Sequence, residues 1–499
     1  MQRAKQTKIN IAIALFHQLI TAVSGLILPR FMILHYGSEA NGLLQSIVQL
    51  LKYTTLLECG IGGMVLAAMY KPLAENDTTR LSGIFNGTKR FFDKISLVFV
   101  GFSLLMCLGI KFIVSTDFGF IYTSALVLVL AMDTYFNYYF GITHILLLKA
   151  DHKLYIVQSV QIVTIILNLI CSIVIMKLGG SIHTVKAVSA CVFLINVITY
   201  RYYVKRHYNI SKPDSTDKTL LPEKKNGIIH HVSYFIHRNT DIVIISAFSG
   251  VINASIYSVY NAVILVIENL LIAISSGVSG AIGNMIAKKE QETLEKTFSI
   301  YETVNTFMTM AISAVAAILI IPFVSVYTSG VKDAVYIQPF FAYIMIAAAI
   351  MYCIRIPYGM VVNSAGHYKE TKTGAVLEAG INLVLSLLLV KPFGLTGVAI
   401  GTFASMTYRT FYTVIYLSKN ILNRPSRYFV KSLIINTAFC VPAVWFFEKY
   451  MVISAENLLE LLIEAVKVSV IVIPVFAVVN LLINKEVFWF IKDIVKKKL

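Results

Sequence analysis

Charged side chains interrupt several otherwise apolar stretches of this sequence, and they are the first candidates for chemistry. Insertion of such a charge into hydrocarbon costs about 3 kcal/mol, so its retention needs a reason. Arg and Lys bind anions such as phosphate, and the Arg guanidinium does so through two parallel hydrogen bonds. Carboxylates at the same depth carry protons, bind Na⁺ or neutralise the arginines. These residues are Arg30, Lys52, Glu58, Asp133, Arg238, Asp241, Glu268, Arg355, Glu378 and Arg409.

Four basic residues are the candidates for binding an anionic substrate: Arg30, Lys52, Arg238 and Arg355. Other interpretations stay open for three of them. Arg30 lies near a helix end, where its side chain can extend to the interface. Arg238 lies three residues before Asp241 on one helix face, so the two charges can neutralise each other. Arg355 lies near the other helix end, where an interfacial role is also open.

The acidic residues have two open interpretations, ion coupling or charge neutralisation. Asp133, Asp241 and Glu378 either carry H⁺ or Na⁺ or act as counter-ions of the arginines, and the counter-ion interpretation is favoured. Glu58 is followed by CGIGG, a small-residue stretch that is compatible with a hinge. GxxxxGK[ST], HExxH and GxSxG motifs are absent, so nothing in the sequence predicts ATP hydrolysis, a metal, another cofactor or an enzyme.

The elements that must hold these residues are membrane helices. The chain has 499 residues, of which 57% are hydrophobic and 14% charged, whereas a soluble chain carries about a quarter charged residues. This excludes a soluble multidomain enzyme and a disordered chain. The interval between Glu302 and Lys332 contains no charged residue. This interval is longer than the roughly 20 residues that a spanning helix needs. The predicted helices are 8–35, 40–70, 92–115, 119–147, 154–177, 183–204, 228–249, 251–283, 300–327, 335–361, 372–391, 395–418, 428–448 and 459–484.

The distribution of basic residues predicts the orientation of these helices. With a cytoplasmic N-terminus, and with helix ends included, 31 of the 43 Lys and Arg residues fall in inside segments and 6, among them Lys186, in outside segments. This asymmetry satisfies the positive-inside rule and places both termini in the cytoplasm. The net charge of +17 is thereby explained by topology and by attraction to anionic lipids, so no nucleic-acid partner is predicted.

Two parts of the sequence resemble each other. YGSEANGLLQSIVQLL (36–51) is similar to SGVINASIYSVYNAVI (249–264), and LLLKADHKLY (146–155) is similar to VVNSAGHYKE (361–370). The offsets, 213 at Gly37 and Gly250 and 215 at His152 and His367, are nearly equal. Six helices per copy give both copies the same orientation, as in transporters whose two bundles flank a central site. We therefore expect an all-α polytopic membrane protein with two pseudo-symmetric six-helix bundles and two C-terminal helices.

This division predicts five segments. They are an N-terminal lobe (1–204), a cytoplasmic linker (205–227), a C-terminal lobe (228–418), two extra transmembrane helices (428–484) and a basic cytoplasmic tail (485–499).

The sequence resembles the multidrug/oligosaccharidyl-lipid/polysaccharide exporter superfamily, and within it the bacterial polysaccharide transporters, or Wzx-type flippases. The resemblance rests on the segment from YGSEANGLLQ to YKPLAEND, on NTDIVIIS (239–246), and on SAGHYKETK (364–372) with LEAGINLVLSL (377–387). It implies a flippase of the bacterial cytoplasmic membrane that moves undecaprenyl-pyrophosphate-linked oligosaccharides for cell-surface polysaccharide synthesis. Implied partners are the lipid-linked oligosaccharide, membrane lipids, a polysaccharide polymerase and a chain-length regulator.

Basic residues on the first two helices also resemble the cationic cavity of lipid II flippases. Two alternatives therefore remain within the superfamily, a cation-coupled multidrug exporter and a lipid II-type flippase. A membrane glycosyltransferase or polymerase would need a large outward loop with catalytic residues, whereas the predicted outside loops have about ten residues or fewer. H⁺ or Na⁺ coupling is left open, as is the identity of the glycan.

Overall fold

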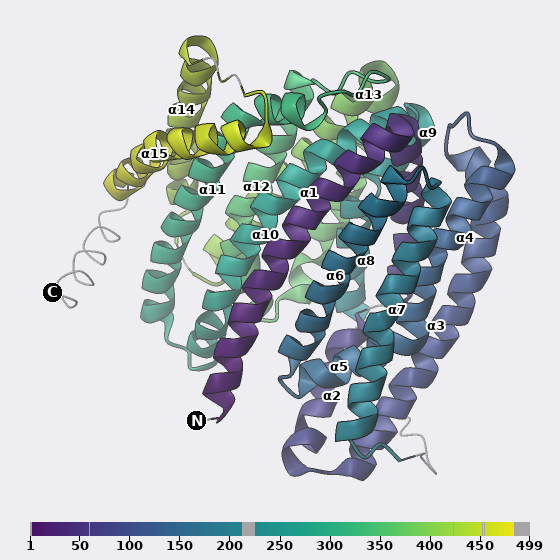
Figure 1. The fold of residues 1–499 in the computed structure, drawn as a ribbon. Coiled ribbons are helices and arrows are strands. Elements are labelled where there is room, and N and C mark those ends of the chain that lie inside the picture. Colours follow the sequence, from purple (N-terminus) through teal and green to yellow (C-terminus); the bar gives the residue numbers. More distant parts are fainter. Residues whose placement is uncertain are drawn as a thin grey trace. The chain divides into compact units, whose positions relative to one another are not determined.

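The structure, a computed structural model, describes residues 2–58, 60–211, 225–422, 424–451, 453 and 455–483. Within these residues the regular elements are helices and there is no strand, which confirms the predicted all-α fold (Figure 1). Most of the predicted linker 205–227 and the whole tail 485–499 lie outside the described residues. The chain divides into two compact units. Unit 1 contains 1–235 and 250–255, and unit 2 contains 236–249 and 256–499.

Unit 1 is built from the N-terminal helices. They are α1 (Gln2–Leu51), the 3₁₀ helix η1 (Lys52–Glu58), α2 (Ile61–Glu75), α3 (Thr78–Ile113), α4 (Phe120–Phe136), the π helix η2 (Asn137–Gly141), α5 (Ile142–Ala150), α6 (Leu154–Lys177) and α7 (Ile182–His207). In this unit α1 packs on α6, α6 on α7 and α3 on α4 (Figure 1). Its core contains Phe92, Leu147 and Met69, all fully buried.

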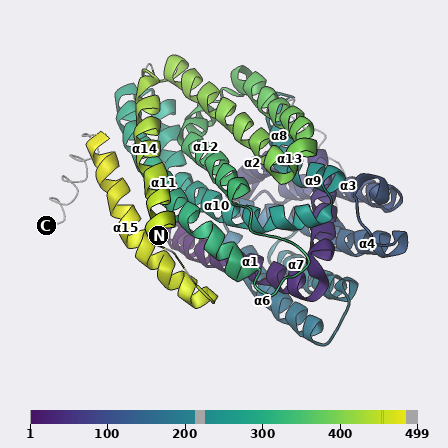
Figure 2. The same cartoon turned by 90° about the horizontal axis from the view of Figure 1, so that it is seen from above.

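Unit 2 contains the later helices and begins within α8. The elements are α8 (Lys225–Asn239), α9 (Asp241–Phe248), α10 (Val251–Ala287), α11 (Gln291–Tyr327), α12 (Pro339–Ser364), α13 (Tyr368–Asn420), α14 (Arg427–Tyr450) and α15 (Leu458–Ile483). Helix α11 is central to their packing because it contacts α12, α14 and α15 (Figure 2). The core around Phe298, Ala314 and Phe476 joins α11 to α15.

The described helices agree with the fourteen predicted spans. Eleven are long and apolar enough to cross a membrane. Two of these, α1–η1 and α13, are pairs of helices joined at Gly37 (φ 83°) and Gly394 (φ 53°). Helices α8 and α9, which meet at Thr240, supply one further segment. The described chain therefore contains fourteen segments, with breaks near the predicted boundaries at 35–40 and 391–395.

Tight turns recur along the chain at a nearly constant spacing. Positive-φ residues pair at Gly37 and Gly250, Asn76 and Lys289, His152 and Gly366, and Gly179 and Gly394. Their offsets are 213, 213, 214 and 215. A backbone hydrogen bond also recurs at the turns of His152 and Gly366. Lys153 N–H donates to Leu148 O at the first turn, and His367 N–H donates to Val362 O at the second. The backbone thus repeats over the two parts of the chain that are similar in sequence.

The two copies differ in the regularity of two helices. The second segment of the first copy is interrupted by η1 and by Gly60 (φ 73°), whereas its counterpart α10 runs unbroken for 37 residues. The fourth segment contains the π helix η2, whereas its counterpart α12 is one continuous α-helix. Both irregular segments belong to unit 1. Short π and 3₁₀ segments within longer helices frequently occur at functional sites.

The two helices outside the repeat are linked by a pair of buried amides. Asn480 Nδ2 donates to Asn436 Oδ1 at 2.8 Å, and Asn436 Nδ2 donates to Asn480 Oδ1 at 3.2 Å. Interhelical amide bonds of this kind contribute about 1 kcal/mol in membranes. They fix the register of α14 against α15.

Candidate functional site

The irregular helices of unit 1 surround a cavity of about 440 Å³, whose largely apolar lining contains a group of charged side chains. Lys52 and Glu58 of η1, Asp133 of α4 and Lys186 of α7 line it, together with Tyr138 of η2. The cavity therefore gathers four charged side chains from three elements, and η2 adds a tyrosine. Three of the predicted site residues, Lys52, Glu58 and Asp133, share this one space.

Backbone geometry explains how these side chains reach the cavity. Irregular backbone at membrane depth is tolerated where it is buried in protein or lines a water-filled cavity. The 3₁₀ turn of η1 changes the angular spacing of its side chains, so Lys52, Thr55 and Glu58, three residues apart, lie on one face. All three line the cavity. The π turn places Asn137 and Tyr138 at the same wall.

The charges of this cavity differ in how they are satisfied. Glu58 accepts a hydrogen bond of 2.6 Å from the Tyr138 hydroxyl. Within the described chain, neither the Lys52 nor the Lys186 ammonium makes an ion pair within 4.0 Å. Asp133 and Lys186 interact electrostatically across the cavity. Two cations that are not committed to a direct ion pair are thus available to an anionic group.

Lys186 was not among the residues predicted from the sequence. It lies in the second turn of α7, which starts at Ile182, whereas the distribution of basic residues predicts it at the outside end of that helix. The sequence does contain a signal that places Lys186 within the helix. Ser181 caps the helix by accepting from Thr184 N–H at 3.2 Å, and a capped start before Ile182 places Lys186 inside the helix.

Arg30 lies apart from this cavity. It follows Pro29 in the first part of α1, is half-buried, and is not among the cavity-lining residues. The structure therefore brings Lys52 together with Glu58 and Asp133, but does not bring Arg30 to them.

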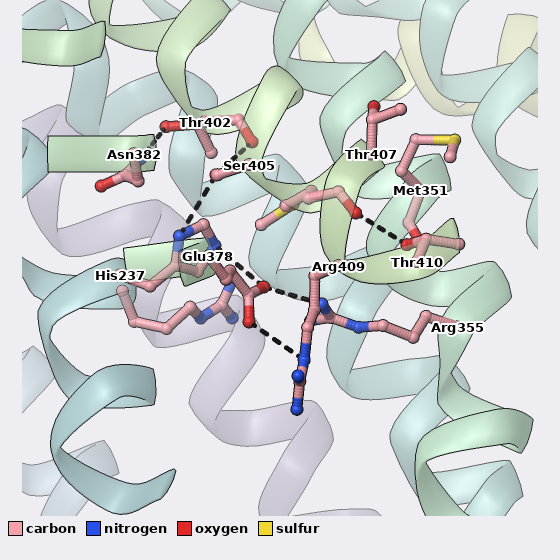
Figure 3. Close-up of polar contacts among 12 residues, drawn as sticks. His237, Met351, Arg355, Glu378, Asn382, Thr402, Ser405, Thr407, Arg409 and Thr410 are labelled. Atoms are coloured by element: carbon pink, nitrogen blue, oxygen red, sulfur yellow. Dashed lines mark hydrogen bonds and ion pairs between the residues drawn. The ribbon is translucent and has the colours of Figure 1, made fainter. Parts of the chain in front are cut away.

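Unit 2 contains a second group of charges, centred on Glu378 of α13 (Figure 3). Arg355 Nη1 of α12 lies 2.7 Å from Glu378 Oε1, and Arg409 Nε lies 3.5 Å from Oε2. His237 Nε2 of α8 lies 4.0 Å from Oε1. The Glu378 side chain is 9% exposed. One buried carboxylate is thus the shared counter-ion of two arginines on two helices.

Arg238 has a different partner from the one that its sequence neighbours suggest. It makes a bidentate ion pair with Glu268 of α10, in which Nη1 donates to Oε1 at 2.9 Å. Glu268 is fully buried. The guanidinium groups of Arg238 and Arg355 lie 5.1 and 5.4 Å from the centre of the Tyr352 ring. Aromatic stacking and ion pairing therefore hold both arginines.

Asp241, the first residue of α9, is surrounded by neutral polar groups. Its carboxylate accepts from Thr402 Oγ1 at 2.8 Å, from Tyr257 Oη at 3.1 Å and from Asn382 Nδ2 at 3.4 Å. Asp241 is 4% exposed. Asn382 Oδ1 is buried without a hydrogen-bond partner in the described structure. A carboxylate beside an unused amide oxygen and hydroxyls is an arrangement of oxygen ligands that suits a small cation.

Comparisons with known proteins identify the fold. No protein-family model and no curated protein matches the sequence. Among solved structures, the lipid II flippase MurJ in an inward closed conformation superposes with a TM-score of 0.72 at 14% identity, over 94% of this chain and 99% of MurJ.

Multidrug transporters are also similar. An inward-facing multidrug resistance MATE family transporter of the MOP superfamily matches with a TM-score of 0.58 at 13% identity, over 82% of this chain and 98% of its own. The MATE transporter VcmN of Vibrio cholerae matches with 0.55 at 14% identity, over 85% and 98%. The chain thus has the polytopic membrane fold that MurJ shares with the MATE transporters of the MOP superfamily.

Proposed function

We propose that this protein is a flippase that moves a polyprenyl-pyrophosphate-linked oligosaccharide across the bacterial cytoplasmic membrane, for the synthesis of a cell-surface polysaccharide. The observation that carries the proposal is the charged cavity of unit 1. A pyrophosphate carries about two negative charges, and burying them without compensation costs many kcal/mol. Lys52 and Lys186 line the cavity and supply the compensating positive charge.

The charges of the cavity suit transient binding. Glu58 and Asp133 line the same space, so the empty cavity is close to neutral. A phosphate that enters attracts the two ammonium groups, and after it leaves, the two carboxylates again balance the positive charge of the cavity. Binding that is favourable and reversible is what alternating access requires, because a substrate held too firmly is not released.

Unit 2 contributes ion coupling in this proposal. The Asp241 group binds Na⁺ or H⁺, and the bound cation neutralises a carboxylate that is otherwise compensated by hydrogen bonds alone. Glu378 is not assigned to ion coupling, because Arg355 and Arg409 already balance its charge. The ion pairs that the arginines of unit 2 form thus stabilise the packing of its helices, while Asp241 is the residue whose charge changes.

The main alternative is a cation-coupled multidrug exporter of the same fold. Cationic drugs favour a site with net acidic charge, whereas in the unit 1 cavity two lysines balance the two carboxylates. The match to MurJ also covers more of this chain than the MATE matches do, 94% against 82% and 85%. A lipid II-type substrate contains the same pyrophosphate. The two substrates are therefore distinguished by comparing transport of lipid II with transport of other glycan lipids.

The first prediction tests this cavity with reconstituted protein. Liposomes containing a fluorescent polyprenyl-pyrophosphate glycan should show transfer between leaflets, and Lys52→Ala and Lys186→Ala should each reduce the rate about tenfold, because each removes one charge-assisted contact to phosphate. The matched control is Lys177→Ala, which removes an exposed lysine at the end of α6 and should transport at the wild-type rate.

Three outcomes contradict the proposal in different ways. Wild-type rates in both cavity variants would remove the cationic cavity from the mechanism. Efflux of ethidium without movement of the lipid would favour the drug exporter. Transfer of lipid II in preference to other glycan lipids would assign the lipid II-type substrate.

A further inference from the structure

A second cavity of unit 1 lies at the ends of its helices, outside the site described above. It has a volume of about 550 Å³. Its walls are the N-terminus of α3 at Thr78, His144 of α5, the last turns of α7, and the chain after α7 up to Ser211. Helix ends mark the end of the apolar spans, so this cavity lies at the level of the lipid headgroups in the membrane orientation of these helices.

The charges of this cavity favour an anion. Arg201 and Lys205, one turn apart on α7, line it, and its lining contains no acidic residue. Neither side chain makes an ion pair with a residue that the structure describes. Lys89 and Arg201 also act electrostatically on His144. The ionised side chains that line this cavity are therefore all basic, in contrast to the cavity of Lys52 and Asp133.

Hydrogen-bond donors lie beside the two cations. The first N–H groups of an α-helix have no partner within the helix, and they carry the positive end of its dipole. At α3 only the Arg80 N–H is capped, by Asp77 Oδ1 at 2.9 Å, while Thr78 lines the cavity. A helix N-terminus of this kind binds phosphate. His144 is 9% exposed, and its Nδ1 has no hydrogen-bond partner in the described chain.

The walls of the cavity are held in place by hydrogen bonds. Ser211 N–H donates to Ser82 Oγ at 3.1 Å, and Asn86 Nδ2 donates to Ser211 O at 3.0 Å. Tyr208 Oη donates to Asp151 Oδ2 at 2.5 Å. Burial and this bond raise the pKa of Tyr208, so the phenol stays neutral and adds no negative charge to the cavity. The site is thus preorganised.

The surroundings favour a lipid over a solute. Tyr202, on the same turns of α7, is 63% exposed, and Arg206 Nη1 donates to its hydroxyl at 3.4 Å. Exposed tyrosines beside arginines are typical of the membrane interface. Anionic headgroups are attracted to basic residues at this level.

We propose that this cavity binds the phosphate of an anionic phospholipid headgroup, held by Arg201, Lys205 and the N-terminus of α3. The two side chains bind the phosphate oxygens, and the helix N-terminus completes the cradle. The site lies apart from the charged residues of the transport proposal. Its test is a binding measurement that does not depend on transport.

The experiment compares lipid binding by native mass spectrometry after release from nanodiscs of phosphatidylcholine and phosphatidylglycerol. Wild-type protein should retain phosphatidylglycerol in preference to phosphatidylcholine. The double variant Arg201→Ala/Lys205→Ala should weaken that binding about tenfold. The matched control Lys369→Ala/Lys419→Ala removes two exposed lysines of α13 and should bind as wild type. The exchange Arg201→Lys/Lys205→Arg should retain most of the binding.

A second titration separates the two sources of phosphate. Delipidated protein is titrated with inorganic phosphate while its melting temperature is followed. Stabilisation of wild type but not of the double variant, without any preference for phosphatidylglycerol, would assign a soluble phosphate and overturn the lipid assignment. Equal binding of phosphatidylglycerol by wild type, double variant and control would overturn the site itself. An unchanged melting temperature of the ligand-free double variant shows that its fold is intact.

Discussion

At the residue scale, the buried charges of unit 2 are compensated locally and in different ways. Glu378 shares two arginines, Glu268 binds one arginine through both oxygens, and Asp241 is held by neutral donors. A buried charge that loses its partner destabilises a fold by about 3–5 kcal/mol. The two ion-paired groups and Asp241 should therefore respond differently to neutralisation.

The second prediction concerns Glu378. Glu378→Gln should lower the free energy of unfolding by about 3 kcal/mol, because it leaves Arg355 and Arg409 without their shared anion. The measurement is thermal or denaturant unfolding of the purified protein in detergent. Glu370→Gln, at an exposed position eight residues earlier in α13, is the control and should unfold as wild type. Equal stability of both variants would show that the arginines do not depend on Glu378.

The third prediction concerns Asp241. Asp241→Asn keeps the side-chain shape and most hydrogen bonds, so the fold should remain, while the dependence of transport on Na⁺ or H⁺ that we propose for Asp241 should be lost. The measurement is the flipping rate in liposomes with imposed Na⁺ and proton gradients. Asp133→Asn, in the cavity of unit 1, is the parallel variant. Loss of gradient dependence in Asp133→Asn alone would move ion coupling to unit 1.

The sequence predicts which charges are buried better than it predicts their partners. Long apolar runs around Asp133 and Glu378, and the apolar segment that follows Arg238, suffice to place these residues at depth. Pairing depends on which helices are neighbours. Arg238 and Asp241 are three apart, but the chain bends at Thr240 between α8 and α9, and Arg238 binds Glu268 thirty residues away. Local spacing carries no information about such a partner.

At the element scale, small residues determine where helices can cross. Gly42 lies in the second part of α1, and a Cβ atom built on it would lie 1.7 Å from the carbonyl oxygen of Val251. No side chain fits at that distance. Asn41 and Ser255 bond at the same contact, where Asn41 Nδ2 donates to Ser255 Oγ at 2.7 Å. Small residues permit this close approach of helix backbones in membranes.

The fourth prediction follows from this close contact. Gly42→Ala should destabilise the protein by about 3 kcal/mol, since the backbones must separate to admit one methyl group. Melting of the detergent-solubilised protein measures the change. Gly101→Ala is the control, because a Cβ there meets no atom within 4 Å and Ala favours the helix. A melting temperature for Gly42→Ala equal to that of the control would contradict the observed crossing.

Helix boundaries were predictable where glycine or a charged loop ends an apolar run. The breaks at Gly37 and Gly394 fall in the predicted gaps. The η1 and η2 interruptions were not predicted, because KYTTLLE (52–58) and NYYFG (137–141) contain no proline and lie within longer helical stretches, so neither signals a change of helix type. Cavity geometry depends on these two segments, so its walls were less predictable than the helices that carry them.

At the scale of the whole molecule, the repeated backbone carries different charges in its two copies. With the offset of 213–215, Lys52 corresponds to Leu265 and Glu58 to Leu271. Arg238 corresponds to Gly25. Conversely, Asn168 and Asn382 are alike, and both are buried. The common architecture is retained, while each copy holds its own set of ionisable groups.

The fifth prediction uses one turn that occurs in both copies. His152 (φ 56°) and Gly366 (φ 75°) occupy equivalent turn positions in the structure, one residue away from the match of His152 with His367 in the sequence. Left-handed conformation costs a non-glycine residue about 1 kcal/mol. Gly366→Ala should therefore destabilise the protein by about 1 kcal/mol, whereas His152→Gly should be neutral or stabilising. Chemical unfolding of both variants tests the pair. The opposite order of stabilities would show that the turns are not equivalent.

The amide pair of α14 and α15 has a consequence for biogenesis. The ribosome releases α14 before α15, so Asn436 enters the translocon when Asn480 is still being synthesised. Acyl chains offer no hydrogen bond to a carboxamide. Insertion of α14 is therefore more favourable when α15 is present to pair with Asn436. We expect these two helices to partition into the bilayer together as a hairpin, which makes their insertion a coupled event.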